Sequence, residues 1–139
     1  MITTRIISTG ACVPEQVITN DDLSKIVDTS DEWITQRTGI KRRHISAGEN
    51  TSYFAINTAR QVLERAEVSA EDVDLIIVAS VTADYGTPSL ACMVQKEIGA
   101  VNAVAFDVNA ACSGFMFALS IADKYIKTGM YENAIVIGA

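Results

Sequence analysis

The stretch Leu75-Ile76-Ile77-Val78-Ala79 is an uninterrupted apolar run. Apolar runs without alternation are typical of a strand that is covered on both faces, as strands of parallel sheets are. One helical pattern precedes this run, and helical and strand patterns alternate after it. The alternation predicts an α/β fold with a mostly parallel sheet and helices packed on its faces.

The elements around this strand are bounded by helix starts and stops in the sequence. Asn50 or Thr51 begins a helix whose small apolar residues recur at helical spacing on one face. Proline at a helix start and glycine after a helix end mark further boundaries. The expected elements are a helix from Pro88 to about Ile98 that Gly99 ends, a strand Val101–Val108, a helix from about Ala111 to Thr128 that Gly129 ends, and a strand Ala134–Gly138.

The first part of the chain has shorter elements. Residues Thr3–Cys12 are rich in β-forming side chains and predict an opening strand. The run Asn20-Asp21-Asp22 predicts an N-cap and a short helix over Leu23–Val27. A second cap at Thr29-Ser30 predicts a helix over Asp31–Thr38 that Gly39 ends, followed by a strand or extended loop over Ile40–Ser46.

Length and composition exclude several classes. The chain has 139 residues, 49% of them hydrophobic and 20% charged, so it is neither a disordered nor a low-complexity segment. One domain is expected at this length. The apolar runs are too short to cross a membrane, and the first residues do not form a signal peptide. Because the chain stops at an apolar strand, we expect it to be a piece of a longer protein.

Charge and cysteine content restrict the partners and the compartment. The net charge of −6 does not favour nucleic acid or an anionic membrane as a partner. Cys12, Cys92 and Cys112 are odd in number and widely spaced. They predict neither a disulfide framework nor a zinc site, and they favour a cytoplasmic location.

Four basic residues form a cluster in this acidic chain: Arg37, Lys41, Arg42 and Arg43. Two interpretations remain open. The cluster binds a small anion or an acidic partner, or it is a solvated, ion-paired turn.

The candidate nucleophile is Cys112, between the strand Val101–Val108 and the long helix. The unpaired amides and the dipole at a helix N-terminus favour the thiolate. Its small neighbours leave room for an acyl group, and a sharp strand-to-helix turn exposes a nucleophile. The alternative is a buried packing residue, which is the interpretation we favour for Cys12 and Cys92. The helix behind Cys112 is apolar nearly all round, so we expect it to be buried and central.

Three motifs carry a resemblance to a known family: Asp28-Thr29-Ser30-Asp31-Glu32-Trp33-Ile34, Arg37–Ile45 (RTGIKRRHI) and Ala110-Ala111-Cys112-Ser113-Gly114-Phe115. Together they resemble β-ketoacyl-acyl carrier protein synthase III, a condensing enzyme of the thiolase superfamily that starts bacterial type II fatty-acid synthesis. The resemblance implies a layered αβαβα fold, of which residues 1–139 are the N-terminal half, and a homodimer. It implies acyl-CoA and malonyl-acyl carrier protein as substrates, with no further cofactor and no metal.

The resemblance also implies roles for single residues. Cys112 matches the cysteine that takes the acyl group from acyl-CoA. Trp33 matches the tryptophan that stacks on the CoA adenine, and Arg37 matches the arginine that contacts the nucleotide and its phosphates. Thr29 is a further candidate for a polar contact to the adenine. Thr87 stands where many members carry a phenylalanine that reaches across the dimer into the acyl pocket, so a bulkier primer would fit.

The resemblance also implies what the chain lacks. The histidine and asparagine that the family uses for decarboxylation come from the C-terminal half, and His44 does not match that histidine. We therefore expect the 139 residues alone to be inactive in condensation. Two alternatives are a polyketide or alkylquinolone starter synthase, and a CoA-binding or interaction domain in which Cys112 only packs.

Overall fold

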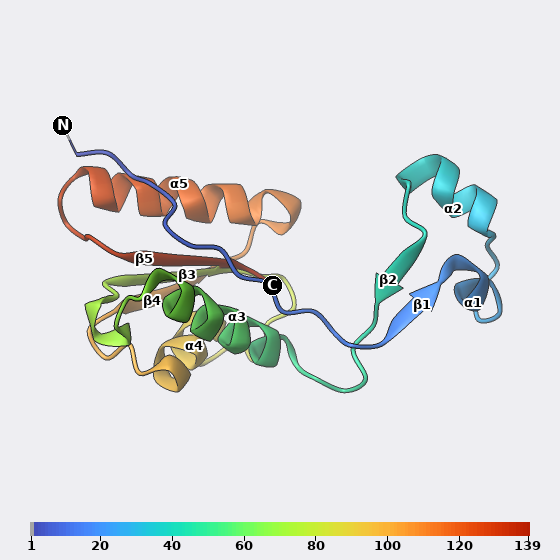
Figure 1. Ribbon diagram of the computed structural model, residues 1–139, viewed down its shortest axis with the longest axis horizontal. Helices are drawn as coiled ribbons and strands as arrows, with labels where there is room; N and C mark the ends of the chain where they lie inside the picture. The colour runs from blue at the N-terminus through green and yellow to red at the C-terminus, as the bar shows by residue number, and fades with distance from the viewer. Residues whose placement is uncertain (1) are drawn as a thin grey trace. The chain divides into compact units, whose positions relative to one another are not determined.

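The computed structural model describes residues 2–139 (Figure 1). The chain divides into two compact units. Residues Val13–Glu49 form the smaller unit, and the segments on either side of them together form the larger unit. Among residues 2–139, no helix is long and apolar enough to cross a membrane.

The larger unit is built on a three-stranded parallel sheet in the order β4-β3-β5. The three strands are in register, with Leu75 opposite Val104 and Ala134. Their carboxyl ends therefore lie together at one edge of the sheet. The strands are β3 (Leu75–Ala79), β4 (Val104–Val108) and β5 (Ala134–Gly138).

Helices cover both faces of this sheet (Figure 1). Helices α3 (Thr51–Ala66) and α4 (Leu90–Ile98) pack on one face, where Ile76 and Val78 point. Helix α5 (Gly114–Lys127) packs on the other face against Leu75 and Ile77. All residues of β3 are buried, which confirms the prediction of a strand covered on both faces. A short 3₁₀ helix, η1 (Ala70–Asp72), precedes β3.

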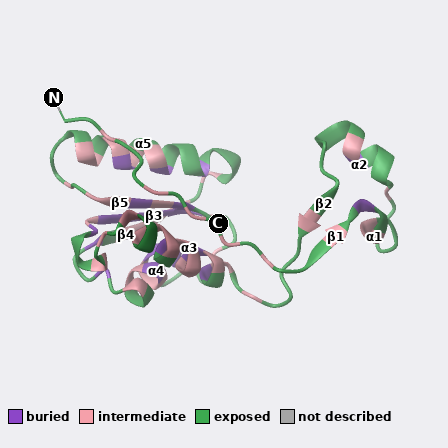
Figure 2. Ribbon diagram, viewed as in Figure 1, coloured by how far each residue is buried: buried purple, intermediate pink, exposed green. Residues whose placement is uncertain are grey.

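Helix α5 differs from the sequence prediction in its burial. Ala118 and Ala122 face the sheet and are buried, but Phe115, Met116 and Phe117 are 44%, 63% and 54% exposed. Figure 2 shows that α5 has exposed stretches along its length. The prediction of a helix buried all round is therefore wrong for residues 2–139. The reason is that the sheet covers only one side of the helix, so the apolar residues on its other side face solvent.

The start of α5 also differs from the prediction. The helix begins at Gly114, because a 3₁₀ turn, η2 (Ala111–Ser113), precedes it. Ala111 has a left-handed backbone with φ of 45°. A non-glycine residue is uncommon in this region, and such residues accompany sharp turns.

The predictions of two strands are wrong: the strand predicted over Thr3–Cys12 is absent, and the strand predicted to begin at Val101 begins later. Residues Thr3–Cys12 form no strand. The reason is that backbone groups of this segment form hydrogen bonds with side chains of α3 instead of with a neighbouring strand. The Gln61 side chain accepts from Ala11 N at 2.9 Å, and Arg65 donates to Thr9 O at 2.7 Å. Strand β4 begins at Val104 and not at Val101, because a turn uses the preceding backbone groups, with Ala103 N donating to Ala100 O.

Helix α4 begins two residues after Pro88. Its N-cap is Ser89, whose hydroxyl accepts from Cys92 N at 3.2 Å. Gly99 ends the helix with a left-handed backbone, as predicted.

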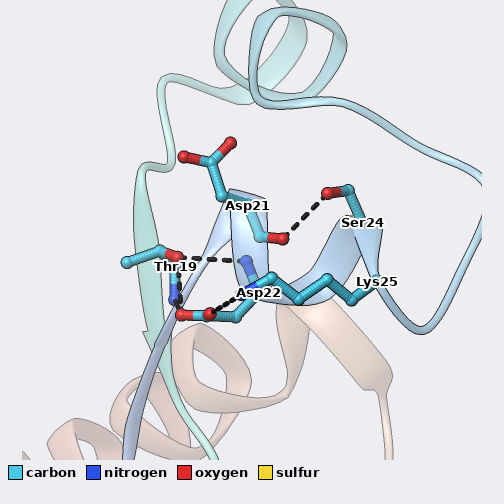
Figure 3. A network of polar contacts seen from close by, with 5 residues as sticks. All are labelled: Thr19, Asp21, Asp22, Ser24 and Lys25. Atoms are coloured by element: carbon cyan, nitrogen blue, oxygen red, sulfur yellow. Dashed lines mark hydrogen bonds and ion pairs between the residues drawn. The ribbon is translucent and has the colours of Figure 1, made fainter.

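The smaller unit has two helices and a two-stranded antiparallel sheet of β1 (Val17–Thr19) and β2 (Arg42–His44). Helix α1 (Asn20–Ser24) begins three residues before the predicted Leu23. The reason is that Thr19 caps it: Asp22 N donates to the Thr19 hydroxyl at 3.1 Å, and Thr19 N donates to the Asp22 carboxylate at 3.2 Å (Figure 3).

Helix α2 (Asp31–Thr38) has the predicted limits. The Ser30 hydroxyl accepts from Trp33 N at 3.1 Å, which caps the first turn. Gly39 ends the helix with φ of 72°, a conformation that favours glycine.

Candidate functional site

Cys112 lies in the turn η2, after β4 and directly before α5. It is exposed, whereas Cys12 and Cys92 are half-buried. Cys92 is on α4, and its thiol lies 3.6 Å from the carbonyl oxygen of Ala105 on β4. Of the three cysteines, Cys112 is therefore the most accessible. It also lies after the carboxyl end of a parallel strand, where α/β proteins build their sites.

Two glycines bring the tip of α5 close to the sheet. A Cβ on Gly114 would stand 3.2 Å from the Ala79 Cβ, at the end of β3. A Cβ on Gly138, at the end of β5, would stand 3.3 Å from the Phe115 ring. Larger residues at either position would separate the helix tip from the strand ends. These contacts fix the turn that carries Cys112.

The electrostatics of this turn favour negative charge. Ser113 is the cap residue of α5, and its side chain makes no hydrogen bond to the first amides of the helix. The first amides of a helix have no partner inside the helix, and the dipole of the helix is positive at this end. The turn can therefore stabilise negative charge that develops on an oxyanion near Cys112.

Two aspartates anchor the loop between β3 and α4, and sequence reasoning missed both. The Asp107 carboxylate accepts from Leu90 N at 2.7 Å and from Ala91 N at 2.8 Å, at the start of α4. The Asp84 carboxylate accepts from Ser52 N at 3.2 Å and from the Ser52 hydroxyl at 2.5 Å, at the start of α3. An acidic residue inside the apolar β4 was the available signal for Asp107.

Thr87 lies in this anchored loop. Its side chain is exposed. The two aspartates fix the loop on either side of it, at the starts of α3 and α4.

The structure brings together two of the three residues predicted to bind the nucleotide. Trp33 and Arg37 are one turn apart on α2, and the Arg37 Cζ lies 4.3 Å from the centroid of the Trp33 ring. The Arg37 Nη1 also donates to Trp33 O at 3.3 Å. The indole is 53% exposed, so a planar ligand has access to it. Thr29 is half-buried, directly before the cap residue Ser30.

The basic cluster does not act as one surface. Lys41 and Arg42 are exposed, but Arg43 is half-buried and its Nη2 donates to the Asn20 Oδ1 at 2.5 Å. Arg43 therefore belongs to the interior of the smaller unit. His44 lies beside it on β2, with its Nδ1 at 2.6 Å from Pro14 O.

The whole chain is similar to known proteins. The family model of 3-oxoacyl-[acyl-carrier-protein (ACP)] synthase III matches residues 106–139, which include Cys112. The chain is 55% identical over 139 residues to a beta-ketoacyl-[acyl-carrier-protein] synthase III of Clostridium novyi, covering 100% of this chain and 43% of that protein. A protein of the same name from Streptococcus mutans is 60% identical over 127 residues, covering 91% of this chain and 39% of that protein.

A solved structure agrees with these relatives. The crystal structure of 3-oxoacyl-[acyl-carrier-protein] synthase III from Aquifex aeolicus VF5 superimposes with a TM-score of 0.95 at 53% identity, covering 98% of this chain and 44% of that chain. The chain thus spans about two-fifths of the length of the relatives that it matches.

The parallel sheet with helices on both faces and the structural match place the chain in the thiolase-like α/β class, as predicted. Within this class, the chain is similar over its whole length to part of the β-ketoacyl-[acyl-carrier-protein] synthase III of Clostridium novyi, and the Aquifex aeolicus structure agrees. The names of these relatives do not favour the two alternatives that the sequence left open, a starter synthase of another pathway and a non-catalytic binding domain.

Proposed function

We propose that Cys112 accepts the acyl group of an acyl-CoA, in the first half-reaction of a β-ketoacyl-acyl carrier protein synthase III. The thiolate attacks the thioester carbonyl, and the carbon–sulfur bond to CoA breaks. The products are an acyl-cysteine and the CoA thiolate, which takes up a proton. The observation that carries the proposal is the exposed thiol directly before α5, whose cap residue Ser113 makes no side-chain hydrogen bond to the first amides. These amides would donate to the oxyanion that forms when the thiol attacks.

We further propose that the Trp33–Arg37 pair binds the nucleotide of CoA. An exposed indole offers a face on which adenine stacks, and a guanidinium donates to phosphate oxygens in a fixed planar geometry. Thr29, before the first turn of the same helix, would add a polar contact to the adenine. The arrangement on one short helix supports this proposal, because one element then carries both recognition groups.

The second half-reaction needs groups that we place outside these 139 residues. Malonyl-acyl carrier protein loses CO2, and the resulting carbanion attacks the carbonyl carbon of the acyl-cysteine. The carbon–sulfur bond to Cys112 then breaks, which releases β-ketoacyl-acyl carrier protein and returns the cysteine as a thiolate that takes up a proton. The one histidine of the sequence is His44, and it lies on β2 against the Pro14 carbonyl. We therefore propose that the 139 residues carry out acyl transfer but not condensation.

The remaining proposals concern the assembly and the primer. We propose that the whole enzyme is a homodimer in the cytoplasm, with no cofactor besides its substrate acyl-CoA. In this dimer Thr87, on an anchored loop, would border the acyl pocket. Because threonine is smaller than phenylalanine, Thr87→Phe should lower the activity with branched primers more than with acetyl-CoA.

Release of free CoA tests the proposal. The 139-residue chain is mixed with acyl-CoA and malonyl-acyl carrier protein, and both free CoA and β-ketoacyl product are measured. We expect about one CoA per chain in a single burst, without product. The burst should be absent in Cys112→Ser and unchanged in Cys92→Ser, which is the matched control. Repeated turnover with product, or a burst that survives Cys112→Ser, would contradict the proposal.

A further inference from the structure

Asn20 is a buried polar residue in the smaller unit, with only 1% of its surface exposed. Its side-chain Nδ2 donates to the Asp31 Oδ1 at 2.8 Å and to Ile40 O at 2.7 Å. Its Oδ1 accepts from the Arg43 Nη2 at 2.5 Å. One amide thus joins the start of α1, the first turn of α2, the loop after α2 and the strand β2.

These contacts decide how α2 is held. The helix has eight residues, and helices of this length are unstable without tertiary contacts. It has one buried residue, Ile34, so little apolar packing is available to fix it. A buried amide whose donors and acceptor are all paired is costly to disrupt, because its partners would lose their hydrogen bonds.

The contacts of Asn20 lie on the face of α2 that is opposite to the nucleotide-binding pair. Asp31 and Thr35 are one turn apart, and the Thr35 hydroxyl donates to the Asp31 Oδ1 at 3.2 Å. Trp33 and Arg37 are also one turn apart, and at about 100° per residue their face points about 200° away from that of Asp31 and Thr35. The rotation of α2 about its axis, which Asn20 fixes, therefore sets the direction of the indole.

We propose that Asn20 is a positioning residue for the Trp33–Arg37 pair: it touches no ligand, and it holds the rear face of α2 so that the indole and the guanidinium face the nucleotide. The proposal rests on the proposed binding of CoA by this pair. It assigns the Asn20 amide a role in affinity, and none in the reactivity of the thiol.

Trp33 is the only tryptophan of the sequence, so its spectra report on this helix directly. The near-ultraviolet circular dichroism of the indole reports its orientation, and quenching of its fluorescence by CoA gives the affinity. For Asn20→Ala we expect about tenfold weaker CoA binding and a diminished indole band. The rate at which iodoacetamide alkylates Cys112 should stay unchanged.

A paired exchange separates positioning from loss of folding. Asn20→Asp alone places a carboxylate against Asp31, and should weaken CoA binding as much as Asn20→Ala. In Asn20→Asp/Asp31→Asn the amide and the carboxylate change places, so the contact between the two residues is restored. This double variant should recover part of the affinity and of the indole band, because a carboxylate at position 20 cannot donate to Ile40 O as the amide does. The matched control is Asn102→Ala, an exposed amide that donates to Glu71 O at 2.9 Å.

The outcomes distinguish this inference from the proposed function. If Asn20→Ala binds CoA like the unaltered chain with the same indole band, or if the exchanged pair recovers neither, the positioning role is wrong. If the unaltered chain does not bind CoA, the nucleotide proposal fails. In that case the indole bands of Asn20→Ala and of the exchanged pair still decide whether Asn20 orients Trp33.

Discussion

Replacing Gly114 tests whether close packing holds the turn that carries Cys112. In Gly114→Ala the new methyl carbon would stand 3.2 Å from the Ala79 Cβ, whereas carbon atoms in contact prefer about 3.5–4.0 Å. Ala79 cannot yield easily, because it is 7% exposed and its strand pairs with a neighbour on each side. The tip of α5 must therefore move by a few tenths of an ångström.

The magnitude follows from two opposing effects. Extra carbon in a packed site costs about 1–3 kcal/mol. Alanine stabilises a helix interior by up to about 1 kcal/mol relative to glycine, and a first turn by less. This gain applies at Gly114, because its φ of −55° is one that alanine adopts readily. We therefore expect Gly114→Ala to lower the free energy of unfolding by about 1 kcal/mol.

Urea unfolding of the 139-residue chain measures this effect. In an Ala79→Gly background, where the opposing methyl is absent, most of the cost of Gly114→Ala should disappear. Gly86→Ala is the control, because nothing lies within 4 Å of its added Cβ, and it should change stability by less than about 0.5 kcal/mol. An equal or higher stability of Gly114→Ala, or the same cost in both backgrounds, would refute the packing argument.

Three further predictions concern other parts of the chain. Trp33→Ala and Arg37→Ala should each raise the acyl-CoA concentration at which acylation of Cys112 is half-maximal in rate by roughly ten- to a hundredfold, without changing alkylation of Cys112. Slower alkylation with an unaltered half-saturating concentration would make Trp33 a structural support. Asp107→Asn should lower the free energy of unfolding by at least about 1 kcal/mol, because one of the two oxygens that accept from the first amides of α4 becomes an NH2 group and the charge is lost. An unchanged urea midpoint would contradict this. The Lys25 and Thr19 side chains hold the pKa of Asp22 well below its ordinary value of 3.8, so its contribution to stability is complete above that pH and is lost as the pH falls through the lowered pKa. Asp22→Asn should therefore show a weaker loss of stability in acid, by Trp33 fluorescence, and an identical acid profile would speak against the capping role.

Local sequence patterns were sufficient to predict those elements whose structure depends on neighbouring residues in the sequence. The apolar run Leu75–Ala79 predicts the central strand, because only a strand between two helical layers buries every side chain. Ser30 and Gly39 predict both ends of α2, because capping depends on neighbouring backbone groups. The position of Cys112 at a helix tip followed from the same kind of local reasoning.

Long-range contacts account for what the sequence could not predict. Asn20 has the residue type of a helix cap, but its amide pairs with residues 31, 40 and 43, which no local pattern connects. The apolar composition of α5 predicts burial, but whether a face is covered depends on which elements pack there. The sequence does not predict the hydrogen bonds of Asp84 and Asp107, because the helix starts to which they bind are distant in the sequence and only the fold brings them close.

The central claim is that Cys112 takes the acyl group from acyl-CoA, and peptide mass analysis tests it most directly. The 139-residue chain is incubated with acetyl-CoA, quenched in acid and digested, and the mass of each cysteine peptide is measured. We predict a gain of one acetyl group on the peptide that contains Cys112, none on those that contain Cys12 and Cys92, and no gain anywhere in Cys112→Ser. Acetylation of another cysteine in preference to Cys112, or no acetylation of a chain that binds CoA, would contradict the account.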